Sequence, residues 1–193
     1  MIAALALALF VADDWKLISR DDGVTVERRE VAGSDYGEVR VRVSCKLAPE
    51  HLFETIWKHK EYLQFMPHLK GITVLREDGD LKWVYQQVKV PLVSDRDYTL
   101  KIRRQIDAES HVYQSFFETD HSAGPPKSAD FERVKLIRGS WTVEPGETGG
   151  SDLTYRVFSD PGSSLPSFIV QTAQKNASAE VVQAMLKRAL ATH

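Results

Sequence analysis

The sequence has only one cysteine, Cys45, among its 193 residues. This excludes an intrachain disulfide and a zinc cluster built from cysteines. The sequence also lacks an excess of either charge, because 25 basic residues face 27 acidic ones and the formal net charge is −2. Dedicated nucleic-acid-binding proteins usually carry a clear basic excess, so binding to nucleic acid is not expected.

Long apolar runs are missing as well. The longest, residues 1–12 (MIAALALALFVA), is too short to span a bilayer, which takes about 20 residues. Two interpretations fit this segment. It resembles the apolar part of a secretory signal, with Ala6-Leu7-Ala8 as a small-x-small site but no basic residue before it. Alternatively, it begins an amphipathic helix that runs to Ile18. The first predicts a periplasmic or secreted protein, the second a cytoplasmic one.

Motifs of catalysis and metal binding are also lacking. No Gly-x-Ser-x-Gly, phosphate-binding loop, dinucleotide-binding glycine pattern or His-Glu-x-x-His occurs. The six histidines are scattered without the spacing of metal ligands. We therefore expect no metal site, no cofactor and no enzymatic activity, although a triad assembled only in three dimensions would leave no motif.

What the sequence does contain is alternation of apolar and polar residues, which predicts β-strands. Segments 24–31 and 36–47 alternate in this way and are separated by the turn residues Gly33-Ser34, so they are expected to form a hairpin. Pro49 suits the first turn of a helix. The expected helices are 49–60, 61–67 and 166–191, and the further expected strands are 71–77, 80–90, 96–106, 111–118, 131–144 and 152–159.

This order of elements predicts the fold. No repeat or long linker divides the chain, so residues 13–193 are expected to form one domain. Strands joined by short turns must be antiparallel, and one face of such a sheet needs a cover. Only the C-terminal helix is long enough to cover it. We expect an α+β helix-grip fold, in which a curved antiparallel sheet wraps around a long C-terminal helix and encloses a hydrophobic cavity.

Small residues on that helix oppose large rings on the strands. Such a pattern fits the wall of a cavity, and it equally fits a solid core in which the rings fill the space. The residues predicted to line the cavity are Trp83, Tyr85, Tyr98, Leu100, Ile102, Phe116 and Tyr155 from the sheet and Ile169, Ala173 and Asn176 from the helix.

Three motifs point to a known family. PLVSDRDYTL begins at Pro91, RGSW begins at Arg138 and is followed by Pro145, and DPGSSLPSF begins at Asp160. In this order they resemble the START (StAR-related lipid-transfer) domains of the helix-grip superfamily, and the resemblance extends from Trp15 to Leu190. It implies that a lipid, sterol or other hydrophobic molecule binds in a tunnel beneath the C-terminal helix. Transfer between membranes, without catalysis, is the implied activity.

The resemblance also implies a gate at residues 90–95. Pro91, Leu92 and Val93 would form an apolar tip that touches a membrane transiently. Asp95, Arg96 and Asp97 would anchor the hinge, with Arg96 pairing with a nearby carboxylate or with backbone carbonyls. A monomer is expected to suffice for this function.

The sequence departs from the family at two points. Ser163 stands where many relatives have glycine. Sterol-binding members that resemble StAR carry a buried acid and a buried arginine, and counting from Arg96 places these near Trp83 and Ile102, which are both uncharged. A cholesterol ligand therefore does not follow from the resemblance.

Two other functions fit the same pattern. Polyketide aromatase/cyclases of this superfamily direct an arginine, tyrosine or histidine into the cavity as acid or base. By strand alternation, the candidates are Tyr85, Tyr98, Tyr155 and Arg138. The third possibility is a protein-interaction module with a filled core.

Overall fold

The computed structural model describes residues 14–89, 94–162 and 167–192. Its strands form one sheet in the order β1-β2-β3-β10-β9-β7-β6-β5-β4, and the short β8 pairs with β6. All neighbours are antiparallel except β8 and β6. The strands are β1 Lys16–Asp21, β2 Val24–Glu30, β3 Gly37–Cys45, β4 Leu69–Asp78, β5 Leu81–Val88, β6 Arg96–Asp107, β7 Val112–Thr119, β8 Glu132–Arg133, β9 Leu136–Pro145 and β10 Ser151–Asp160.

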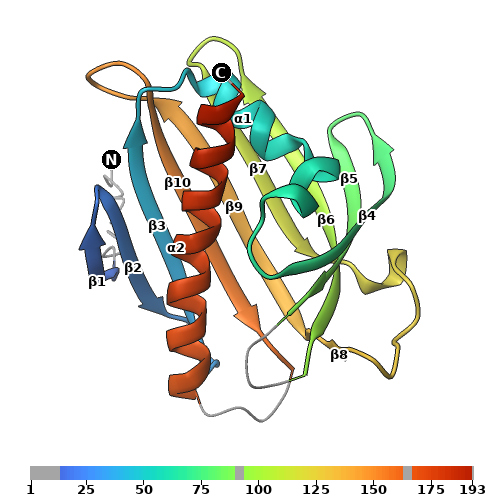
Figure 1. Cartoon of the computed structure of the whole chain (residues 1–193). Coiled ribbons are helices and arrows are strands. Elements are labelled where there is room, and N and C mark those ends of the chain that lie inside the picture. Colours follow the sequence, from blue (N-terminus) through green and yellow to red (C-terminus); the bar gives the residue numbers. More distant parts are fainter. Residues whose placement is uncertain (1–13, 90–93, 163–166, 193) are drawn as a thin grey trace, which may run out of the picture.

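The long helix α2 (Ser167–Ala191) lies across one face of the curved sheet, as the alternation of the sequence predicts (Figure 1). We call this face of the sheet the inner face and the opposite one the outer face. A shorter helix, α1 (Pro49–Trp57), and the 3-10 helix η1 (His59–Gln64) cover the end of the inner face near the C-terminus of α2 (Figure 1). A second 3-10 turn, η2 (His121–Ala123), lies between β7 and β8.

Apolar side chains of the sheet and both helices form the core. Leu52 and Ile56 of α1 are fully buried, and so are Val182 and Met185 of α2. The predicted hairpin of residues 24–31 and 36–47 is present as β2 and β3. The late strand β10 then pairs with β3, so the beginning and the end of the sheet-forming chain meet in the middle of the sheet.

The structure corrects three predicted elements. A helix running from residue 1 to Ile18 is wrong, because Lys16–Asp21 form the edge strand β1. The segment 61–67 was expected to be a helix of its own, and only its first part is helical, within the 3-10 turn η1. The strand expected at 131–144 changes partner midway, because Glu132–Arg133 pair with β6 whereas the residues from Leu136 pair with β10.

Candidate functional site

Strand register decides which predicted wall residues reach the inner face. Tyr155 pairs with Val41 on one side and with Trp141 on the other, and both of these belong to the core beneath the helices. Tyr98 pairs with Gln86, two positions from the fully buried Val84. Leu100 and Ile102 follow Tyr98 at alternate positions, so four of the predicted wall residues, Tyr98, Leu100, Ile102 and Tyr155, lie on the inner face.

The inner face is closed at one end and partly accessible further along. Leu153 of the central strand β10 is 1% exposed and lies toward α1. Tyr155 and Val157, the next inner-face residues of the same strand, keep accessible surface. Tyr98 across the sheet does so too. Of these residues, Tyr155 and Val157 belong to β10, a strand that α2 contacts, so their accessible surface lies where packing beneath a helix normally seals a sheet.

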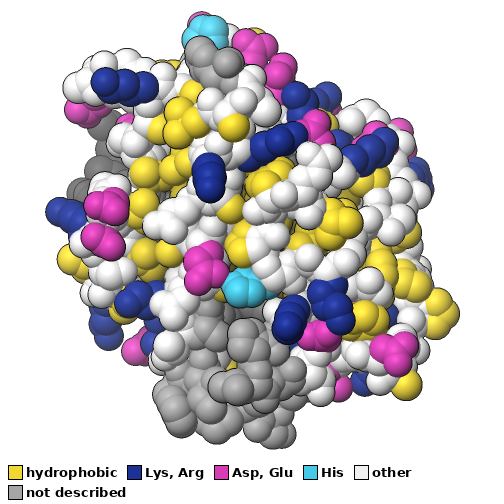
Figure 2. Space-filling model, in the orientation of Figure 1, with side chains coloured by type: hydrophobic (Ala, Val, Ile, Leu, Met, Phe, Trp, Pro, Cys, Tyr) yellow, Lys and Arg dark blue, Asp and Glu magenta, His cyan; other side chains and the backbone are white. Residues whose placement is uncertain are grey.

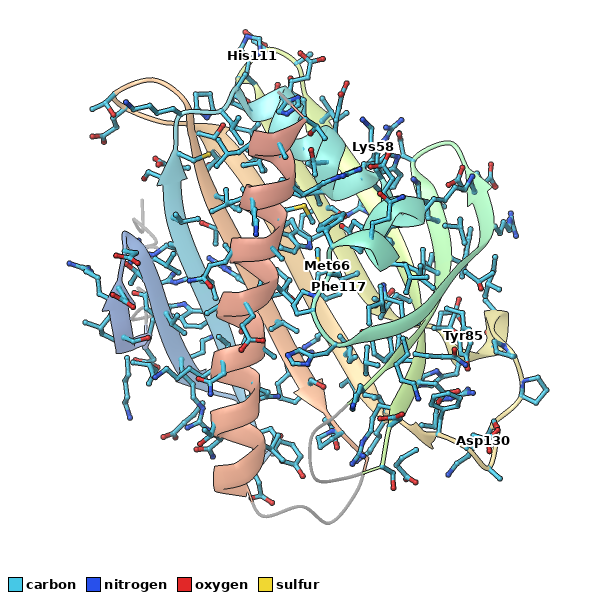
Figure 3. The ribbon with its side chains drawn as sticks, in the orientation of Figure 1. Lys58, Met66, Tyr85, His111, Phe117 and Asp130 are labelled. Carbon is cyan, nitrogen blue, oxygen red and sulfur yellow. The ribbon has the colours of Figure 1, made fainter. Side chains whose placement is uncertain are left out.

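The rings around this region form a neutral wall. The Trp141 and Tyr155 ring centroids lie 4.2 Å apart, and Phe117 stacks on Tyr155 at 6.2 Å. The hydroxyl of Tyr98 donates a hydrogen bond to Oε1 of Gln86 at 2.9 Å. Figure 3 shows Phe117 and Met66 between α2 and the β4–β5 side of the sheet. An apolar guest lying here would meet aromatic faces and one amide–phenol pair.

Tyr98 and Tyr155 keep some accessible surface, but desolvation still raises the pKa of both phenols well above the ordinary value of 10.0. The native state therefore holds these protons at a pH where the unfolded chain releases them. We expect the free energy of unfolding to fall as the pH rises above about 10. In a spectrophotometric titration, both phenols should ionise together with unfolding. In Tyr98→Phe and Tyr155→Phe, the free energy of unfolding should fall less steeply with pH above about 10. Ionisation of both phenols near pH 10 in the folded protein would contradict their desolvation.

The face that α2 packs on the sheet differs from the face predicted from its small residues, which included Ala173 and Asn176. Its buried residues are Val170, Ser178, Val182, Met185 and Ala189, and Asn176 is exposed. On the helix surface facing η1 and β4, Glu180 accepts a hydrogen bond from Nε2 of His68 at 2.7 Å, and Arg188 pairs with Glu61 at 2.7 Å. Polar contacts therefore tie α2 to the segment η1–β4.

The structure places three predicted wall residues on the outer face. Trp83 donates from its indole nitrogen to Asp120 at 2.9 Å, and Tyr85 donates to the buried carboxylate of Asp97 at 3.0 Å. Phe116 pairs with Arg103, whose guanidinium lies over its ring. Strand alternation was misassigned by one position here, because both faces of β5 and β7 carry large side chains. Figure 3 shows Tyr85 near η2.

The rest of the predicted site lies outside the described parts. The gate tip of Pro91, Leu92 and Val93 is not among the described residues, and neither are the side chains of Ile169 and Ala173. The predicted hinge anchor Arg96 is buried and donates to the backbone carbonyl of Ser94, one of the two partners expected for it.

Asp97, a second residue of the predicted hinge anchor, has a partner that the sequence analysis did not predict. Asp97 is 0% exposed and receives two hydrogen bonds from Arg133, at 2.7 and 2.9 Å. Arg133 also donates to the carbonyls of Pro125 and Pro126, so one ion pair fastens the loop after β7 to the start of β6. Alternation alone marks Asp97 as a side chain facing away from Tyr98, but no local signal in the sequence identifies Arg133 as its partner.

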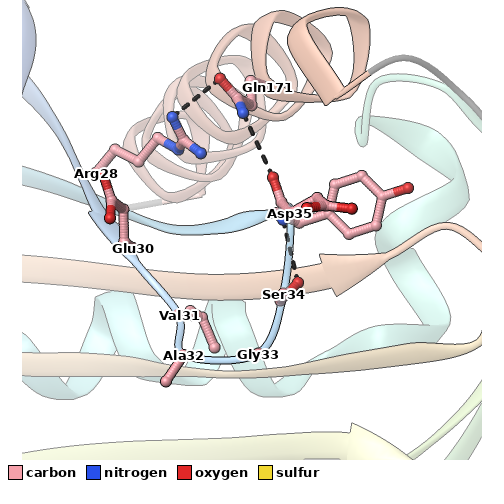
Figure 4. Close-up of a pocket in the computed structure, with 9 residues that line it drawn as sticks. Arg28, Glu30, Val31, Ala32, Gly33, Ser34, Asp35 and Gln171 are labelled. Carbon is pink, nitrogen blue, oxygen red and sulfur yellow. Dashed lines mark hydrogen bonds between the residues drawn. The ribbon is translucent and has the colours of Figure 1, made fainter.

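A polar hollow of about 460 Å³ opens beside the first turns of α2 (Figure 4). Arg28 donates to Oε1 of Gln171 at 2.9 Å, and Gln171 donates to the carbonyl of Asp35 at 3.5 Å. These bonds attach α2 to β2 and to the loop between β2 and β3.

Among the described residues, no group of three or more His, Cys, Asp or Glu side chains could hold a metal ion. None of the described helices combines the length and the apolar composition that a membrane span needs.

Comparison with known proteins agrees with this architecture. Phosphatidylcholine transfer protein of Mus musculus is 24% identical over 177 residues, which are 90% of this chain and 83% of the mouse protein. An uncharacterized protein of Pseudomonas aeruginosa is 27% identical over 181 residues, which are 89% of this chain and 87% of that protein.

Solved structures repeat the fold. The STAR-related lipid transfer protein of Xanthomonas axonopodis superposes with a TM-score of 0.83 at 22% identity, over 92% of this chain and 99% of that one. The aromatase/cyclase ZhuI of Streptomyces superposes with a TM-score of 0.58 at 16% identity, over 79% and 92%. The family model of the START domain matches residues 3–191. The chain therefore belongs to the START domain family, as its three motifs predict.

Proposed function

We propose that this protein binds a lipid or another hydrophobic molecule between α2 and the inner face of its sheet, and that it carries this molecule between membranes. The observation that supports the proposal most is the accessible surface of Tyr155, Val157 and Tyr98 on a sheet face that a helix covers. Membership of the START family and the likeness to phosphatidylcholine transfer protein point the same way.

The wall suits such a guest energetically. Each methylene group moved from water into an apolar space contributes about 0.8 kcal/mol. Two acyl chains or a ring system thus bind without any catalytic group, provided that the space can close. The residues proposed to contact the ligand from the sheet are Tyr98, Leu100, Ile102 and Tyr155, and those proposed from α2 are Ile169 and Ala173. The gate remains proposed at residues 90–95, and we expect a monomer to carry out the transfer.

A cyclase-like activity is the second candidate because of the likeness to the aromatase/cyclase fold. Two of the four residues considered for it, Tyr85 and Arg138, lie on the outer face, where Arg138 lies over the ring of Phe158. The raised pKa values of Tyr98 and Tyr155 keep both phenols protonated at neutral pH. They can donate hydrogen bonds or act as acids but do not serve as bases, so only an acid role in such a reaction is open to them.

The identity of a natural ligand tests the proposal directly. The purified full chain should be extracted with organic solvent and the extract analysed by mass spectrometry, in parallel with native mass spectrometry of the intact protein. We expect a lipid at near one copy per chain and a mass difference that matches it. A chain that carries no lipid and takes up none from vesicles would overturn the proposal.

A further inference from the structure

A second hollow, of about 250 Å³, lies where α1 meets η1, and its lining residue Lys82 pairs with Ile102 of β6. It is formed by the end of α1, the start of η1, the end of β4 and the start of β5. Its lining residues are Trp57, Lys58, His59, Lys60, Glu61, Glu77 and Lys82. Figure 3 labels Lys58 at this junction. Nothing in the lipid-binding proposal uses these residues.

The buried cation in this hollow is Lys82. Its side chain is 9% exposed, and its ammonium lies 4.1 Å from the ring centroid of Trp57. The ammonium donates to the backbone carbonyl of Trp57 at 2.9 Å and lies 3.4 Å from Glu77. An ammonium has three N–H bonds, and these two acceptors engage two of them. Arg104 adds a second cation over Trp57, at 5.0 Å from the ring centroid.

The carboxylates of the hollow are already engaged. Glu61 accepts from Arg188 at 2.7 Å, and Glu77 is shared between Lys82 and Lys60, the latter at 3.8 Å. Three lysines line the hollow against two glutamates, so the lining has one positive charge more than it has negative ones. Two arginines stand next to it, and each has a carboxylate partner at 2.7 Å, Arg188 in Glu61 and Arg104 in Asp80.

Two titratable groups of the hollow have lowered pKa values, and burial is the largest cause for both. Burial and the charge of Lys82 lower the pKa of His59 to about 4, so its imidazole is neutral at pH 7. Burial lowers the pKa of Lys82 itself, with Arg104 and Lys60 acting in the same direction against the attraction of Glu77. A bound anion would offset the repulsion among these cations, as an opposite charge close by favours the charged form of each.

We infer that the hollow at the α1–η1 junction binds a phosphoryl group, with Lys82 at its base and Lys58 and Lys60 at its rim. Lysine serves as a point charge for phosphate, and a volume of about 250 Å³ leaves room for the group with its water. A phosphoryl group is present both in a soluble phosphate ester and in the headgroup of an anionic lipid at a membrane surface. Figure 2 shows lysine and arginine side chains gathered over this part of the molecule.

The experiment uses inorganic phosphate as the probe, titrated into the full chain by calorimetry, with chloride added to match the ionic strength. We expect saturable binding, and the ring resonances of His59 should shift during the same titration followed by NMR. Lys60→Gln and Lys58→Gln are each expected to weaken binding about fivefold, and Lys82→Met should abolish it. The matched control is Lys16→Gln, which removes a lysine 77% exposed on the edge strand β1 and should change nothing.

Vesicles separate the two sources of the phosphoryl group. Flotation with phosphatidylcholine vesicles, with and without phosphatidic acid, is repeated in the presence of phosphate. If the protein binds the anionic vesicles, and if both added phosphate and Lys60→Gln reduce this binding, the site is assigned to a lipid headgroup. If the protein binds phosphate but not the vesicles, the site is assigned to a soluble ester. No saturable phosphate binding, or an equal loss in Lys16→Gln and Lys60→Gln, would overturn the inference. Because Lys58 and Lys60 are exposed, their variants test it even if Lys82→Met does not fold.

Discussion

Replacing Asp97 by alanine is expected to lower the free energy of unfolding by about 3–5 kcal/mol, the usual result of breaking a buried ion pair. Asp97 is fully buried, and its removal would leave the guanidinium of Arg133 without the carboxylate that accepts two of its hydrogen bonds. Tyr85 would lose its acceptor too. Urea denaturation followed by circular dichroism measures the change.

The control for this variant is Asp78→Ala. Asp78 also pairs with an arginine, Arg76 at 2.9 Å, but both side chains are more than 60% exposed, so a change below about 1 kcal/mol is expected. Similar losses in the two variants would show that the Asp97–Arg133 pair is not a structural anchor.

The same pair predicts an effect of pH. Burial alone would raise the pKa of Asp97, but the hydrogen bonds from Arg133 and Tyr85 outweigh burial and lower it below 3.8. The unfolded chain therefore binds this proton first, and the stabilisation is complete above about pH 4 and lost as the pH falls below it.

Replacing Val157 by tryptophan is expected to reduce the amount of bound lipid at least about tenfold while the protein stays folded. Val157 keeps accessible surface on the inner face, next to Tyr155, so a larger ring there would occupy the space proposed for the ligand. Lipid uptake from vesicles, measured by mass spectrometry, and thermal unfolding are the two readouts.

The comparison variant is Val41→Trp on the adjacent strand β3. Val41 is 0% exposed, and enlarging a side chain in a filled core costs about 1–3 kcal/mol or more. If the interior is filled by the protein itself, Val157→Trp should be destabilised as much as Val41→Trp, with no effect on lipid. That outcome would contradict a binding space under α2.

Much of the fold follows from the sequence because its signals are local. Alternation in Val39, Val41 and Val43 defines a strand whatever surrounds it, and Pro49 marks the first turn of α1. The break between β8 and β9 has no such local mark. It arises because Arg133 is drawn to Asp97, 36 residues away in the chain, while Leu136 joins β10.

The candidate site was harder to predict, for a physical reason. A strand shows two faces, and the choice between them depends on what covers each one. On β6, Tyr98, Leu100 and Ile102 alternate with polar residues, so the inner face is clear. On β5, two of the inner residues, Lys82 and Gln86, are polar. The rings of Trp83 and Tyr85 therefore make the outer face look the more apolar one, yet they donate hydrogen bonds to Asp120 and Asp97 there. On α2, the alanine spacing predicts one buried face, whereas the fully buried side chains are those of Val182 and Met185.

The pairing of β3 with β10 also has a consequence for how the chain matures. Ser44 and Asp152, which bond across these strands, are 108 residues apart in the chain. During translation the β2–β3 hairpin leaves the ribosome with one edge unoccupied until β10, which begins at Ser151, has been made. Contacts of such long range slow folding, and an unpaired strand edge is open to aggregation meanwhile. We therefore expect nascent chains that stop before β10 to be the ones that depend on chaperones.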